Sequence, residues 1–295
     1  MLRNFGRGLL AVAALVGAAG AAEAQDSYTL RYKFRPGMFA HYEVSNKTMI
    51  ETRFADTLET NQNETQAWKQ FRVISADEQG QATLEPMIDR VKMTVKLGSE
   101  EPITFDSASP GAVLPGPFQK VSDSVGKPLA RLQVTARGEL IKVTPLAADV
   151  PGLTDKSSNF LIVFPEAAVK VGEKWKDTFE VPITVSKGLN RPFTLRREYT
   201  LVSVAGQTAT IKQSTRPLGI IEDPQVEMQL MQRMPNTEIV FDLERGLIVS
   251  QTTKVDSTVV NALGPRTQVS AVCSNVETLV SAPPAVAAGA AAETK

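Results

Sequence analysis

The stretch Gln268–Val280, QVSAVCSNVETLV, alternates its side chains in a way that decides the fold class. Successive side chains of an extended chain point to opposite faces, so residues two apart share a face. The two faces here carry Val272, Val276 and Val280 on one side and Val269, Ala271, Cys273 and Leu279 on the other. This pattern predicts a β-strand near the end of the chain.

The same alternation recurs near the start, in Ala40–Ile50. Tyr42, Val44 and Ile50 share one face, and His41, Glu43 and Lys47 share the other. Val, Ile and Thr make up 66 of the 271 residues after position 24, and such β-branched side chains favour a pleated surface. Further strands are expected at Tyr28–Phe34, Trp68–Ser75, Gln81–Leu97, Leu129–Thr135, Leu140–Thr144, Trp175–Val185, Phe193–Val204, Gln207–Gln213, Thr237–Leu243 and Leu247–Val260. We therefore expect a mainly β fold with antiparallel sheets, of the sandwich or half-barrel kind.

Helical signals are few. Phe118–Gly126 is one candidate, because its apolar residues have helical spacing and Gly126 would end the helix. Pro224–Met234 is another, with Asp223 as its N-cap, although its apolar residues also alternate as in a strand. Gly98–Pro117 is expected to be an irregular connection, since it is rich in Pro, Ser and Gly.

Three landmarks occur in the same order in both halves of the chain. They are a turn with Gly37 or Gly172, a strand–turn–strand unit beginning at Phe71 or Tyr199, and an Arg-Gly turn at Arg137-Gly138 or Arg245-Gly246. One interpretation is a duplication, with an N-terminal β lobe at 25–148 and a C-terminal β lobe at 149–281. The other interpretation is that similar hairpin turns arose independently in the two halves, because Gly suits β-turns in any protein. The Ala/Pro-rich tail 282–295 has no core pattern and is expected to be disordered.

The first 24 residues have the features of a secretory signal peptide. Arg3 and Arg7 precede the apolar stretch Leu9–Gly17, and Ala22-Glu23-Ala24 fits the small-x-small cleavage pattern. The apolar stretch is shorter than a membrane span of about 20 residues, so we expect cleavage after Ala24. We then expect a soluble periplasmic or extracellular protein with no later membrane span. Its single Cys excludes an internal disulfide, so burial must stabilise it.

Three segments carry a family resemblance: Leu30–Gly37, Val171–Trp175 and Phe241–Ile248. They resemble uncharacterised bacterial secreted β-rich proteins of a domain-of-unknown-function family. The resemblance implies export and β architecture. It brings no activity and no site residue.

Composition and motifs give little support for catalysis. The chain has 32 Lys and Arg, 32 Asp and Glu, one His and one Cys, which gives no electrostatic footprint for nucleic acid and excludes multi-histidine and thiolate metal sites. His41 is expected on the polar face of its strand beside Glu43. Ser124 and Lys127 fit a Ser-x-x-Lys pattern with Ser157-Ser158-Asn159 downstream, but Gly126 and Pro128 would break the helix that this chemistry needs.

The remaining candidates also have structural interpretations. The acid pairs Asp77-Glu78, Glu100-Glu101 and Glu222-Asp223 lie beside turns, where solvated charge is the ordinary state. Cys273 is expected to be a buried small hydrophobe. Trp68, Trp175 and the methionines Met228, Met231 and Met234 are expected to pack cores. The sequence thus predicts no catalytic residue, no metal site and no cofactor, and leaves the ligand-binding residues unknown.

The sequence therefore favours an exported, non-catalytic binding or structural module of the periplasm or cell envelope. A carrier of a lipid or other apolar ligand, held between a curved sheet and the helices, is one alternative. A carbohydrate-active hydrolase with two facing carboxylates is the other. The partner would be an unknown protein, the envelope or an apolar small molecule, and not a nucleic acid.

Overall fold

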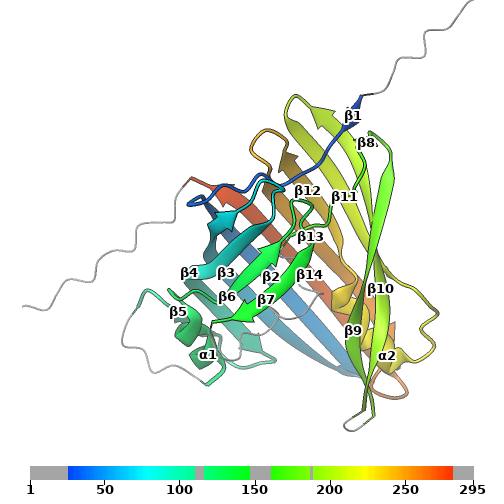
Figure 1. Cartoon of the computed structure of the whole chain (residues 1–295). Helices are drawn as coiled ribbons and strands as arrows, with labels where there is room; N and C mark the ends of the chain where they lie inside the picture. The colour runs from blue at the N-terminus through cyan, green and yellow to red at the C-terminus, as the bar shows by residue number, and fades with distance from the viewer. Residues whose placement is uncertain (1–25, 110–115, 147–160, 187–188, 282–295) are drawn as a thin grey trace, which may run out of the picture.

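The computed structural model describes residues 26–109, 116–146, 161–186 and 189–281. The signal peptide expected at 1–24 and the tail expected at 282–295 lie outside these ranges. Within the described residues, twelve strands form one antiparallel sheet, with the path β7-β6-β4-β3-β2-β14-β13-β12-β11-β10-β9 and with β5 paired to β4, while β1 and β8 form a separate two-stranded sheet. The sheet is open and curves into a trough (Figure 1). This confirms the expected mainly β, antiparallel fold.

Most of the predicted strands are present, and some of them are longer than predicted. In the first half they are β1 Ser27–Tyr28, β2 Phe39–Phe54, β3 Thr57–Ala76, β4 Ala82–Leu97, β5 Ile103–Asp106, α1 Gly116–Ser124, β6 Ala130–Val134 and β7 Leu140–Pro145. In the second half they are β8 Val169–Lys170, β9 Lys174–Ser186, β10 Leu189–Ala205, β11 Thr208–Pro217, α2 Pro224–Leu230, the 3₁₀ helix η1 Met231–Arg233, β12 Asn236–Asp242, β13 Leu247–Val260 and β14 Thr267–Val280.

The two halves of the chain run through the sheet in the same order. Strands β2, β3, β4, β6 and β7 form one meander, β9 to β13 form the second, and β14 pairs with β2 to join them. The turns correspond as well: the Gly37 N–H donates to the Val73 carbonyl at 2.9 Å, and the Gly172 N–H donates to the Leu201 carbonyl at 2.7 Å. Both glycines have positive φ. The three landmarks thus occupy equivalent places in the two meanders, and both halves contribute to one core.

The register of the sheet defines two faces. We call inner the face that carries Tyr42, Phe71 and Leu84, and outer the face that carries His41 and Trp68. The largest buried cluster lies on the inner face and draws on both meanders, with Phe71, Leu84 and Val134 from the first and Tyr199, Phe241 and Leu247 from the second. The predicted alternation in Ala40–Ile50 and Gln268–Val280 is thereby confirmed.

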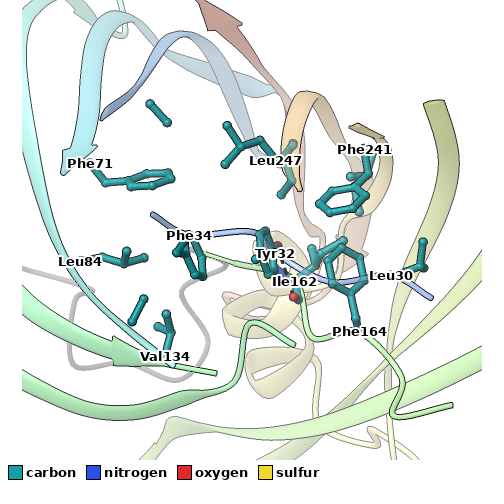
Figure 2. Packing of buried hydrophobic residues seen from close by; sticks show 14 of the residues in the cluster. Leu30, Tyr32, Phe34, Phe71, Leu84, Val134, Ile162, Phe164, Phe241 and Leu247 are labelled. Carbon is teal, nitrogen blue, oxygen red and sulfur yellow. Dashed lines mark hydrogen bonds between the residues drawn. The ribbon is translucent and has the colours of Figure 1, made fainter. Parts of the chain in front are cut away.

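Two segments outside the sheet complete this cluster. Leu30, Tyr32 and Phe34 lie between side chains of the two meanders, and Ile162 and Phe164 pack beside them (Figure 2). Tyr32 and Lys33 donate backbone hydrogen bonds to Ala136 and Gly246, which lie in turns of opposite halves. We call residues 30–34 and 161–164 the crossing segments.

The prediction of a strand over Tyr28–Phe34 was therefore wrong beyond Tyr28. Leu30, Tyr32 and Phe34 are all buried, so the alternation that suggested a strand is present. However, the backbone of this segment forms hydrogen bonds with two separate turns and not with a neighbouring strand. Only Ser27 and Tyr28 pair in a short ladder, with β8. Burial of every second residue indicates an extended chain, but it does not show which segment the chain hydrogen-bonds to.

The helices cover other parts of the inner face. In α1, Phe118 packs against Val91 and Phe105, and Gly126, at φ +74, follows the helix end as predicted. In α2, the Asp223 carboxylate accepts from the Gln225 N–H at 2.8 Å, which confirms the predicted N-cap and the helical alternative for this segment. No helix within the described ranges is long and apolar enough to cross a membrane.

Gly98–Pro117 is not wholly irregular, because it contains β5. Ile103–Asp106 pairs with Val95–Lys92 of β4, and the Arg90 guanidinium binds the Asp106 carboxylate at 2.7 Å. Phe105 is the one buried side chain of this four-residue strand. So short a segment with a single apolar anchor gives almost no periodic signal.

Candidate functional site

A cavity of about 190 Å³ lies between the crossing segments and the inner face of the sheet, where strands of both meanders line it. Most of its lining is apolar. Its apolar lining residues are Tyr32, Tyr42, Phe71, Pro86, Met87, Ile88, Leu129, Leu161, Leu247 and Ile248. An engineered apolar cavity of about 150 Å³ binds benzene, so this one has room for an aromatic ring system or a short alkyl chain.

One ion pair borders this cavity. Lys69 of β3 and Glu277 of β14 both line it, and the Lys69 Nζ lies 2.8 Å from a Glu277 carboxylate oxygen. The Gln251 side chain on β13 belongs to the same lining. The pair neutralises both charges, so the cavity presents apolar walls and a polar but uncharged margin. This arrangement fits a neutral apolar group better than an ion.

Two buried tyrosines fix the cavity wall. The Tyr42 hydroxyl donates to the Ile248 carbonyl at 3.1 Å, and the Tyr32 hydroxyl accepts from the Ile162 N–H at 3.0 Å. Burial raises the pKa of both phenols above the ordinary value. Both groups are therefore neutral at physiological pH. The Tyr32 bond joins the two crossing segments to each other, and the Tyr42 bond joins β2 to β13.

The second meander carries an ion pair on its inner face, between a buried arginine and a half-buried aspartate. Arg197 of β10 is 5% exposed, and its guanidinium lies 3.2 Å from the Asp177 carboxylate of β9 and 3.8 Å from the centroid of the Phe179 ring. Burial raises the pKa of Asp177, while the charge and hydrogen bond of Arg197 act in the opposite direction. Tyr199, Gln213, Thr215 and Thr237 are also buried on this face.

His41, the one histidine, lies on the outer face, as the alternation of side chains in Ala40–Ile50 predicts. It is half-buried, its ring stacks on Phe39 at 6.1 Å, and its Nδ1 has no hydrogen-bond partner among the described residues. Nearby, the Gln70 amide donates to Asp89 at 2.7 Å. Burial raises the pKa of Asp89, and the Gln70 hydrogen bond and the charge of His41 lower it. Sequence reasoning missed Asp89, because a β-bulge at Trp68/Lys69 sets its position.

The raised pKa of Asp89 gives a testable pH dependence. A carboxyl whose pKa is higher in the folded than in the unfolded protein contributes stability at low pH, and that contribution is lost as the pH rises through the folded pKa. Asp89→Asn should therefore be more stable than the wild type at pH 7, by less than about 1 kcal/mol because Asp89 keeps contact with water. Thermal unfolding at pH 4 and pH 7 tests this; an advantage that is larger at pH 4 would contradict it.

The acid pairs singled out in the sequence are not brought together. Asp77-Glu78, Glu100-Glu101 and Glu222-Asp223 are all exposed, and Asp77 and Asp223 accept backbone hydrogen bonds within a turn and a helix cap. The two carboxyls with raised pKa, Asp89 and Asp177, lie on opposite faces of the sheet. Neither set forms the facing pair that a glycoside hydrolase needs.

Ser124 and Lys127 are also not brought together. Ser124 donates to the Val121 carbonyl and Lys127 donates to the Asp123 carbonyl, so both side chains close the end of α1. Ser157, Ser158 and Asn159 lie outside the described residues. Among the described residues, no three His, Cys, Asp or Glu side chains gather as they would around a metal ion.

The remaining candidates lie in packed surroundings. Met231 is buried, and Met228 and Met234 pack at the margins of two clusters. Trp175 stacks on Tyr199 at 5.3 Å, and Trp68 lies on the outer face under the Arg90 guanidinium. Cys273 is only half-buried, less than predicted, and lies opposite Thr48 in the ladder.

Comparisons with known proteins identify the family resemblance more closely. Residues 151–248 match DUF6263, a family of unknown function, which confirms the expected resemblance to an uncharacterised family. No curated protein matches the chain. A chain in the complex structure of Pseudomonas aeruginosa MucA/MucB aligns at 7% identity over 80% of this chain and 89% of that chain, with a TM-score of 0.12. A TM-score this low does not establish a common fold.

Proposed function

We propose that the protein is an exported, non-catalytic binding module that holds the apolar part of a small amphiphile. The observation that carries the proposal is the apolar cavity between the inner face and the crossing segments. Well-packed protein interiors leave few voids larger than a water molecule. A cavity of about 190 Å³ with apolar walls is therefore a candidate ligand-binding site. The expected signal peptide supports export.

The cavity lining favours binding over catalysis. Its ionisable groups are two neutral tyrosines and the Lys69–Glu277 pair, in which each charge compensates the other. His41, which any histidine-based chemistry would require, lies on the other face of the sheet. The proposal therefore combines the binding module with the apolar-ligand carrier, and it gives no role to paired carboxylates.

Filling the cavity should abolish uptake of an apolar probe. Ile88 lines the cavity from β4 and is half-buried, so Ile88→Phe adds volume to the space that the ligand would use. We expect 1-aminonaphthalene, a neutral two-ring fluorophore, to bind the wild type with blue-shifted emission. Its affinity should fall at least about tenfold in Ile88→Phe, because the added ring competes for the same volume.

Ile141→Phe is the matched control, since Ile141 is exposed on β7 and does not line the cavity. It should bind the probe as the wild type does. Native mass spectrometry of the full chain from its own host then asks what it carries, with a bound amphiphile as the expected result. Equal probe binding in both variants, or no binding to the wild type, would refute the proposal.

A further inference from the structure

A row of polar side chains crosses the inner face of the sheet. The hydrogen-bonded register aligns one residue from each of seven neighbouring strands. We call this row the polar belt, and its members are Thr65, Asn46, Asn275, Thr253, Thr237, Gln213 and Tyr199. Apolar clusters lie on either side of it along the strands, so the belt interrupts what would otherwise be an apolar lining.

The belt carries hydroxyl and amide groups and no formal charge. Ion pairs are the nearest charged groups along the strands: Lys69 with Glu277, and Asp177 with Arg197, each of which is neutral as a pair. Hydroxyls and amides act as both donors and acceptors. A surface of this kind matches a ligand that has many hydroxyls and no charge.

Hydrogen-bonding capacity in the belt is left unused. The Gln213 amide donates to Thr215, but its Oε1 has no partner, although the residue is only 3% exposed. The fully buried Tyr199 hydroxyl, in contrast, already interacts with Asp177 and Arg197. Buried polar atoms are nearly always paired, and each exception calls for an explanation. A ligand hydroxyl would supply the missing partner.

The belt is continuous with the cavity. Glu277 and Gln251 line the cavity, and Asn275 and Thr253 lie two residues from them along β14 and β13, on the same face. Two residues of a strand span about 7 Å, which is within the length of one small amphiphile. The apolar and polar surfaces can therefore contact the same molecule.

We propose that the polar belt binds the uncharged, hydroxyl-rich head of an amphiphile, such as a sugar-bearing lipid, whose apolar part fills the cavity. This inference rests on the proposed function and names the class of ligand. Its occupant is an uncharged amphiphile and not a fatty acid or a cationic lipid, because the belt offers no unpaired charge to attract either ion.

The head-group preference can be measured with three octyl compounds. The full chain with Trp68→Phe keeps Trp175 as its one tryptophan, and Trp175 stacks on Tyr199 at the end of the belt. Its fluorescence is followed while octyl β-glucoside, octanoate or octyltrimethylammonium is added below its micelle concentration. We expect the glucoside to bind at least about tenfold more tightly than either ion.

Thr253→Val tests the belt itself. Valine keeps the shape and strand preference of threonine but removes the hydroxyl. We expect octyl β-glucoside affinity to fall about threefold to tenfold, with 1-aminonaphthalene binding unchanged. Thr252→Val, on the outer face of the same strand, should change neither.

The outcomes separate the two proposals. If 1-aminonaphthalene binds but the three octyl compounds bind equally, or octanoate binds best, the head-group inference is overturned and the cavity proposal stands. An unchanged glucoside affinity in Thr253→Val also overturns it. If the naphthyl probe does not bind at all, the proposed function itself fails.

Discussion

Replacing Gly138 with Ala should lower the free energy of unfolding by about 2–5 kcal/mol, since a left-handed alanine costs about 1–2 kcal/mol and overpacking adds about 1–3 kcal/mol. Gly138 has a φ of +86°. A Cβ there would lie 2.3 Å from the Ile162 carbonyl oxygen and 2.7 Å from the Tyr32 ring. Tyr32 and Ile162 are hydrogen-bonded to each other, so the crossing segments cannot move aside independently.

Gly172→Ala is the matched control for this prediction. Gly172 has nearly the same φ, +89°, but a Cβ there would meet nothing within 4 Å. Only the conformational penalty of about 1–2 kcal/mol should remain. Urea unfolding of both variants measures the difference. Equal losses of unfolding free energy would show that the crossing segments do not restrict the Gly138 turn.

The second large effect is expected from Arg197→Met. Removing one partner of a buried ion pair leaves an uncompensated charge and costs about 3–5 kcal/mol. Here the change would leave the half-buried Asp177 carboxylate without its guanidinium and would also remove the contact with the Phe179 ring. Denaturant unfolding at pH 7 should show the loss.

The same two strands provide its control on the other face. Lys174 and Glu198 form an exposed pair at 2.9 Å, and exposed pairs contribute less than about 1 kcal/mol. Lys174→Met should therefore be almost neutral. If Arg197→Met were equally mild, the Asp177–Arg197 pair would contribute nothing to the stability of the second meander.

The strands with an apolar inner face could be predicted from the sequence, and the polar part of the inner face could not. Alternation located β2 and β14 to within a few residues. The first half of β3, which reads TLETNQNETQ from Thr57, was not predicted as strand, because both of its faces are polar. Asn63 and Thr65 in this stretch face inward only because β2 and β4 pair with it on either side.

The candidate site was missed for a related reason. Tyr42 and Val44 were assigned to one face, but nothing in the sequence shows that Lys69 and Glu277, 208 positions apart, meet beside them. Such contacts depend on the β2–β14 pairing, which joins the two ends of the described chain. Single-sequence periodicity reports which face a residue occupies and carries no information about which strand lies next to it.

The open sheet has one further consequence, at its two margins. Its terminal strands within the described residues are β7 and β9, and unpaired strand edges are templates on which a second copy of a protein can add. Lys142 and Pro145 lie on β7, and Lys174, Lys176 and Pro182 lie on β9. Lysines repel an incoming strand and proline lacks the N–H that a new ladder would need. The lysines and prolines on β7 and β9 therefore disfavour edge-to-edge addition of another copy at both margins of the open sheet.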